Sequence, residues 1–352
     1  MNDKRLFLSR FGMLSSLGVG AEVNGCAMQC GYDGFEASNF LGNRSEPYLT
    51  AECRLNSSLT GIGKQATMIA QSLLQTFDGY SSDEINAIPI VFCLPNRPDI
   101  WDAQQNAVMI LSRVKELLAE HNIRPNKHNQ LILENRCAVA SAFGIADDLL
   151  KNRVAQQVAV VTSDSLITRS AMDYFSGDMY EDGIRLLTED NPNGFIPGEA
   201  TVSFIISNKT EKGQPHLVCS GWGQSEEQAI WVSGKVCNAK GLVQSTRNAL
   251  QMAEQKMSDM DFILSSVSGE DYFFKEVALA STQSLEQKVD EQPLYLPATH
   301  IGEVGTAIGG AMLVMLLYAM KNDFGQNYKA VVMISDDDSQ RTSFIIECVG
   351  QD

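Results

Sequence analysis

The sequence predicts an α/β protein in which mostly parallel strands are covered on both faces by helices. Three observations lead to this class. Short apolar stretches alternate along the chain with stretches of helical periodicity. The stretch 158–161 is wholly apolar, as expected for a strand in a sheet that is buried on both faces. No low-complexity segment or long Pro/Gly linker divides the 352 residues, so any two halves must pack closely together.

The expected elements follow one another in a regular order. We expect strands at 6–9, 88–94, 131–133, 158–161, 201–206, 217–221, 262–264, 330–334 and 344–348. We expect helices at 64–77, 101–121, 138–150, 243–256, 272–280 and 304–320. The second half repeats the order of the first, which suggests an internal duplication with halves at 1–210 and 211–352.

The predicted helix at 304–320 contains no charged residue, so we ask whether it could span a membrane. It is slightly short for a membrane span and opens with Gly and Ala. Only Glu303 and Lys321 stand at its ends, and no aromatic belt flanks it. We therefore expect a helix buried in the core of a globular protein.

Composition and charge restrict the function. Asp and Glu outnumber Lys and Arg 43 to 27, and the resulting charge of −16 opposes binding to nucleic acids and to anionic membranes. The first ten residues lack the apolar stretch of a secretory signal. The eight cysteines are scattered without the paired spacing of a zinc site, which fits reduced thiols in a cytosol. We therefore expect a cytoplasmic protein with no nucleic-acid or membrane partner, no metal and no cofactor.

Four stretches are similar to segments of the thiolase and β-ketoacyl-synthase superfamily, in the same order and at plausible spacing. They are LFLSRFGMLSSLG at 6–18, CAVASA at 137–142, GFIPGEA at 194–200 and IGEVGTAIGGA at 301–311. The resemblance implies a thiolase fold, in which two duplicated βα halves stack as five αβαβα layers around the helices at 138–150 and 304–320. It also implies a homodimer. The stretches 268–276 and 301–305 further resemble a branch of ketosynthase-like proteins associated with type VI secretion clusters.

Condensing enzymes of this superfamily use a nucleophilic cysteine at a helix N-terminus, two histidines and a Gly-rich loop. Cys137 stands at the position that matches the nucleophile, directly before a predicted helix. The helix end and a nearby histidine would lower the pKa of the thiol, so that the thiolate attacks an acyl thioester. The other interpretation is that Cys137 is a small buried residue of the core.

The remaining catalytic positions of the superfamily are altered in this chain. Glu303 matches the second histidine, and a carboxylate there would raise the pKa of a neighbouring thiol and repel an enolate. A shifted register would bring His300 to that place instead. Ser266 or Ser268 matches the first histidine, and neither can supply its charge or proton. Asp336 to Asp338 replace the Gly-rich loop, and we expect them to form a solvated turn rather than a cation site.

These substitutions lead to two hypotheses. The first is a catalytically degenerate ketosynthase-like protein that binds a protein partner, such as an effector, spike or adaptor protein of type VI secretion. The second is an active acyl-thioester enzyme in which Cys137 accepts the acyl group and Glu303 acts as acid or base, with Ser268 and His300 as further candidates.

Overall fold

The computed structural model describes residues 5–42, 45–55, 58–177, 184–210, 216–322 and 328–348. Its strands are β1 (Leu6–Ser15), β2 (Gly18–Val19), β3 (Glu36–Leu41), β4 (Pro47–Thr50), β5 (Ile90–Leu94), β6 (Gln130–Leu133), β7 (Gln157–Ser165), β8 (Glu199–Ser207), β9 (His216–Glu226), β10 (Phe262–Ser265), β11 (Leu294–Tyr295), β12 (Lys329–Ser335) and β13 (Gln340–Cys348). Its α-helices are α1 (Ala21–Gln29), α2 (Gly61–Thr76), α3 (Ser82–Ala87), α4 (Ala103–Ala119), α5 (Ala138–Lys151), α6 (Arg169–Phe175), α7 (Lys240–Ala253), α8 (Asp271–Ser284), α9 (Ala298–Ile301) and α10 (Ile308–Asn322).

Eleven strands form one sheet, and its two parts have the same topology. The order β1-β8-β7-β5-β6 in one part corresponds to β9-β13-β12-β10-β11 in the other. In both parts the first two contacts are antiparallel and the next two are parallel. An antiparallel contact between β1 and β9 joins the two parts. This repetition agrees with the duplicated fold, whereas the exact domain boundaries at 1–210 and 211–352 stay a prediction.

The expectation of mostly parallel strands was wrong, because half of these contacts are antiparallel. β8 lies between β1 and β7 and runs against both of them. β13 has the corresponding place between β9 and β12. A run of apolar residues indicates that a strand is covered on both faces, but it does not indicate the direction of the strand.

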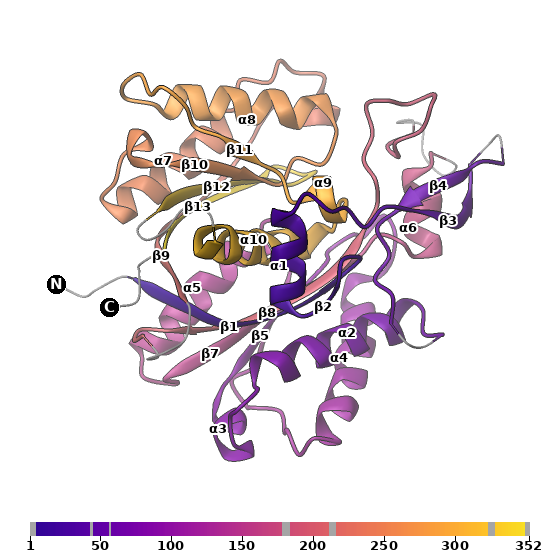
Figure 1. Ribbon diagram of the computed structural model, residues 1–352, viewed down its shortest axis with the longest axis vertical. Coiled ribbons are helices and arrows are strands. Elements are labelled where there is room, and N and C mark those ends of the chain that lie inside the picture. The colour runs from indigo at the N-terminus through magenta and orange to yellow at the C-terminus, as the bar shows by residue number, and fades with distance from the viewer. Residues whose placement is uncertain are drawn as a thin grey trace.

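The layers follow the αβαβα order expected for the thiolase fold. α5 and α10 lie between the two parts of the sheet and contact strands of both (Figure 1). α2 and α4 cover the outer face of the part that contains β1, and α7 and α8 cover the outer face of the other part (Figure 1). The described side chains of α10 are almost all buried, as predicted, whereas α5 is buried at seven of its fourteen residues.

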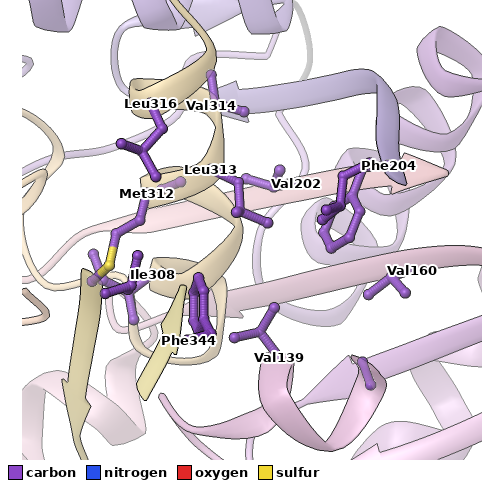
Figure 2. Close-up of a cluster of buried hydrophobic side chains, with 14 of the residues drawn as sticks. Val139, Val160, Val202, Phe204, Ile308, Met312, Leu313, Val314, Leu316 and Phe344 are labelled. Atoms are coloured by element: carbon purple, nitrogen blue, oxygen red, sulfur yellow. The ribbon is translucent and has the colours of Figure 1, made fainter. Parts of the chain in front are cut away.

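The centre of the molecule is an apolar layer to which α5, α10 and strands of both parts contribute (Figure 2). Met312 and Leu313 of α10 have no exposed surface, and neither has Phe344 of β13. Val139 of α5 lies so close to α10 that a Cβ at Gly309 would come within 2.6 Å of it. The close approach of the two helices therefore depends on a glycine.

The predicted helix at 304–320 begins later than expected. Gly305–Ala307 form a 3-10 turn and α10 starts at Ile308, because Gly302 and Gly305 have φ values of 70° and 51°. Two elements that we did not predict are α1, which contacts α10, and the separate β3–β4 hairpin at the edge of the molecule (Figure 1). In the described part of the chain, no helix has both the length and the apolar character needed to cross a membrane.

Candidate functional site

Cys137 stands at the start of α5, where the sequence placed it, but its thiol is enclosed. Only 1 % of the residue is exposed, and Sγ lies 3.8 Å from the carbonyl oxygen of Ile334. Burial raises the pKa of the Cys137 thiol well above its usual value, and the carboxylate of Asp336 adds to this rise. Arg341 opposes the shift without reversing it. The thiol is therefore protonated near neutral pH, as expected for a buried core residue.

Glu303 is also buried, with 1 % of its surface exposed, and both of its carboxylate oxygens have partners. Oε1 accepts a hydrogen bond from the backbone N–H of Gly305 at 2.7 Å. Oε2 accepts hydrogen bonds from Nε and Nη2 of Arg136 at 3.0 and 2.9 Å. The backbone donor belongs to the turn before α10, and Arg136 is a partner that we did not predict from the sequence. Its signal in the sequence was a charged residue directly before the apolar stretch at 137–140.

The Arg136–Glu303 pair belongs to an ionic chain of five buried or half-buried side chains. Arg136 Nη1 donates to Asp337 Oδ1 at 2.8 Å. Arg185 contacts both oxygens of Asp337 at 3.0 Å and both oxygens of Glu270 at 2.9 and 2.7 Å. We refer to Glu303, Arg136, Asp337, Arg185 and Glu270 as the ionic chain. Bidentate guanidinium–carboxylate contacts of this kind are strong and fix the geometry of both partners.

Arg136 and Arg185 determine the protonation of Asp337 in the ionic chain. Burial alone would raise the pKa of Asp337, but Arg136 and Arg185 hold it well below its usual value. The Arg185 guanidinium also lies 4.5 Å from the ring centre of Trp231, which adds a cation–π contact. Three carboxylates and two guanidiniums therefore meet in the ionic chain, which includes Glu303, the residue that the resemblance matches to the second histidine.

The prediction that Asp336 to Asp338 form a solvated turn holds only for Asp338, which is exposed. Asp336 is 2 % exposed, and the Asp337 side chain is two-thirds buried. The loop closes around Arg341, whose Nη1 donates to the carbonyl oxygens of Asp336 and Asp338 at 3.0 and 2.7 Å. Arg341 in turn pairs with Glu276, and both side chains have 0 % exposure. Arg136 and Arg185, which pair with Asp337, come from distant parts of the chain, so the local run of aspartates gave no sign of them, whereas Arg341 stands only three residues after Asp338.

Asp336 is the group of this loop with the most unusual protonation. Burial raises its pKa to about 7, and the neighbouring Asp337 contributes to the rise. Arg136 opposes the shift, but its Nη1 is 4.0 Å from Asp336 Oδ1, which is too long for a hydrogen bond. Asp336 therefore titrates near neutral pH.

The other candidate residues make no side-chain contact with the ionic chain among the described hydrogen bonds. Ser266 is buried, and its Oγ accepts a hydrogen bond from the backbone N–H of Ser335 at 3.1 Å. Ser268 lies half-buried in the loop between β10 and α8. His300 lies in α9, and its Nδ1 is 2.8 Å from the carbonyl oxygen of Tyr32. The alternative register, in which His300 replaces Glu303, is not supported by these contacts, and a catalytic role for Cys137, Glu303, Ser268 or His300 stays a prediction.

Two of the stretches that carry the resemblance are held together by their backbones. The N–H of Glu303 donates to the carbonyl oxygen of Ile196 at 2.8 Å, and the N–H of Gly198 donates to the carbonyl oxygen of Glu303 at 2.8 Å. A Cβ at Gly302 would lie 2.5 Å from the Ile196 oxygen, and a Cβ at Gly198 would collide with the Ile301 oxygen. We refer to this contact as the glycine joint. Only glycine allows the two backbones to come this close.

A second buried ion pair fixes the start of α10 to the sheet. Arg97 contacts both oxygens of Asp164, at the end of β7, at 2.9 and 2.7 Å. The backbone N–H of Thr306 donates to Asp164 Oδ2 at 2.9 Å. The helix that follows Glu303 is therefore positioned by a carboxylate at its N-terminus.

A cavity of about 470 Å³ opens beside the ionic chain. Its walls include Arg97, Asn135, Phe175, Arg185 and Trp231, with Asp337 at the side of the ionic chain, whereas Cys137 is not among the lining residues. Within the described residues, no group of three or more His, Cys, Asp and Glu side chains is arranged to hold a metal ion. The geometry can therefore enclose a ligand or a partner's side chain, but it does not present an activated thiolate to it.

Comparison with known proteins establishes the fold of this chain. No protein-family model and no curated protein sequence matches it. Among solved structures, it is similar to the AntDE:AntF complex, a type II PKS acyl-carrier protein with its ketosynthase, with a TM-score of 0.76, 12% identity, and coverage of 98% of this chain and 99% of that chain. It is also similar to the ketosynthase from module 6 of the bacillaene synthase of Bacillus subtilis 168, with a TM-score of 0.74, 10% identity, and coverage of 98% and 72%.

A third similar structure contains two kinds of subunit. It is the ketosynthase ApeO in complex with its chain length factor ApeC from Xenorhabdus doucetiae, with a TM-score of 0.72, 12% identity, and coverage of 98% of both chains. At these identities the likeness shows the fold alone. The chain therefore has the thiolase-like fold of ketosynthases, as the sequence predicted.

Proposed function

We propose that this protein is a catalytically degenerate ketosynthase-like protein whose role is to bind a protein partner. The observation that carries the proposal is the Arg136–Glu303 ion pair, in which the residue that matches the second histidine is buried and neutralised by a guanidinium. A carboxylate supplies no N–H donor to an enolate oxygen, and both oxygens of Glu303 are already engaged by Arg136 and by the backbone of Gly305. The enclosed Cys137 thiol, with its raised pKa, supports the same proposal.

The proposed partner follows from the resemblance of 268–276 and 301–305 to proteins of type VI secretion clusters. We propose an effector, spike or adaptor protein of that system, bound in the cytoplasm by a homodimer of this chain. The pairing of a ketosynthase with a chain length factor in one similar structure is consistent with a fold that serves in protein assemblies. Co-expression with each protein encoded beside this chain, followed by size-exclusion chromatography, tests for a stable complex and for the homodimer.

Intact-mass spectrometry after incubation with acetyl-CoA or malonyl-CoA tests the loss of condensing chemistry. The proposal predicts no stable acyl adduct on the wild-type protein. The matched control is Cys137→Ala, because it removes the candidate thiol and leaves the other seven cysteines in place. A thioester that forms on the wild type and disappears in Cys137→Ala would overturn the proposal in favour of an acyl-thioester enzyme.

A further inference from the structure

A second cavity lies at the other end of the part of the sheet that contains β1. It has a volume of about 260 Å³ and lies between α4 and the edge of the sheet formed by β5 and β6. Phe92 and Leu131 are register partners on these strands and face the same way, and Leu111, Leu118 and Ile123 complete the apolar wall. The space is open to the surface on the side where Lys115, Arg124 and Pro125 are exposed. It shares no lining residue with the cavity beside the ionic chain.

The rim of this cavity is cationic although the whole chain is strongly acidic. Lys115 and Arg124 are lining residues, and both are exposed. The nearest carboxylate along the helix, Glu116, is engaged by Arg113 at 2.7 Å. Within the described residues, neither Lys115 nor Arg124 has a carboxylate within 4.0 Å. Two positive charges therefore stand at the mouth of an apolar space without a counter-ion from the described chain.

The rim is held in place by hydrogen bonds that do not involve these charges. The backbone N–H of Arg124 donates to Asn86 Oδ1 at 2.7 Å, and Asn126 Nδ2 donates to the carbonyl oxygen of Asn86 at 2.9 Å. Asn129 Oδ1 accepts from the N–H of Ile90 at 2.8 Å. The loop between α4 and β6 is thus fixed at both ends by hydrogen bonds within the chain. Preformed apolar cavities with a few placed polar groups are typical of small-molecule sites.

We propose that this cavity binds a linear aliphatic carboxylate, with the hydrocarbon chain inside and the carboxylate between Lys115 and Arg124. The apolar wall offers water too few hydrogen-bond partners, so a hydrocarbon chain is the better occupant. The two rim cations select a carboxylate over a neutral or cationic head group. This site is separate from the Cys137 region, and the proposal does not depend on the loss of condensing activity.

Isothermal titration calorimetry with decanoate, kept below its micelle concentration at pH 7.5, tests the site. We expect saturable binding of one decanoate per chain, and binding of decanol that is weaker by about two- to tenfold, because decanol cannot pair with the rim cations. Leu111→Trp should abolish decanoate binding by filling the cavity from a half-buried position. The double variant Lys115→Gln and Arg124→Gln should reduce decanoate affinity to that of decanol.

The matched control is Lys127→Gln, which removes a charge from the same loop but not from the cavity lining. It should bind decanoate like the wild type, and the melting temperatures of all variants establish that they are folded.

Absence of saturable decanoate binding to the folded wild type would overturn the proposal, and so would equal binding of decanoate and decanol. Undiminished binding to folded Leu111→Trp would also overturn it, because decanoate would then occupy another site. If decanoate does not bind and Leu111→Trp changes the sedimentation coefficient of the free protein, the cavity is an interface between copies of the chain.

Discussion

Two buried regions at the centre of this molecule differ in their chemistry. The apolar layer around α10 consists of hydrocarbon side chains that interlock between the two parts of the sheet (Figure 2). The ionic chain beside it joins three carboxylates to two guanidiniums. When a side chain in the apolar layer is shortened, the stability of the protein falls in proportion to the volume that is removed. Truncation in the ionic chain leaves a partner charge buried, so its members stabilise the fold only as a set.

The largest effect is expected from Arg136→Ala. This change removes both side-chain donors from Glu303 Oε2 and one from Asp337, so Glu303 loses its paired cation while Asp337 keeps Arg185. We expect a loss of about 3–5 kcal/mol in the free energy of unfolding, because breaking a buried ion pair leaves an uncompensated charge. Denaturant unfolding at pH 7.5 measures this loss.

Glu303→Ala completes a double-mutant cycle with Arg136→Ala. Glu303→Ala alone should cost about 1–3 kcal/mol, because Arg136 keeps Asp337 as a partner. The double variant should lose clearly less than the sum of the two single losses. The Glu303→Ala protein should still bind its partner, since the residue stabilises the core. Additive losses, or a variant as stable as the wild type but without function, would contradict the structural role of Glu303.

In the apolar layer, Leu313→Ala should lower the free energy of unfolding by no more than Arg136→Ala does. Leu313 has 0 % exposure, and its truncation should cost about 3 kcal/mol. Ile308→Val, which removes one methylene in the same layer, should cost about 1 kcal/mol. Denaturant unfolding of both variants tests whether stability falls in steps with the volume removed. If Leu313→Ala lowered the free energy of unfolding by less than Ile308→Val does, the layer would not be closely packed.

The next prediction concerns Asp336 and the dependence of stability on pH. Its pKa is about 7 in the folded protein, compared with an ordinary value near 3.8, so between these values the folded protein keeps a proton that the unfolded chain releases. Stability contributed by this group therefore falls as the pH rises from about 4 to 7. Asp336→Asn should gain stability relative to the wild type across this window.

Melting temperatures from pH 4 to 8 measure the difference between Asp336→Asn and the wild type. Asp148→Asn, on the exposed side of α5, is the control and should keep the wild-type profile. A difference that stays constant over the whole window would contradict the assignment to Asp336.

The smallest effect is expected at Cys137 itself. Iodoacetamide at pH 7.5 should modify the exposed Cys30 and leave Cys137 unmodified, because burial keeps the Cys137 thiol protonated and inaccessible. Peptide mass spectrometry after different times of labelling separates the two sites. Cys137 should react once guanidinium chloride unfolds the protein. Fast, selective modification of Cys137 in the folded protein would reveal an activated thiolate.

The same comparison explains how much the sequence could predict. The burial of α5 and α10 follows from apolar patterns within single segments, and the order of motifs was sufficient for the five-layered fold. The ionic chain could not be predicted, because Arg136 is 167 residues from Glu303 and 201 residues from Asp337. Only the folded topology brings these charges together. The aspartates at 336–338 were misinterpreted for the same reason, since their local composition resembles that of any exposed turn.

The glycine joint has a consequence for how such proteins are identified. Gly198 and Gly302 are present because two backbones touch there, and this requirement is independent of the side chain at position 303. A chain can therefore exchange the reactive groups of a ketosynthase while its glycine pattern stays intact. Sequence searches that give weight to these glycines detect an architecture and not a chemistry. To separate working condensing enzymes from inactive members of the fold, the residue at position 303 and the charge that faces it are the better markers.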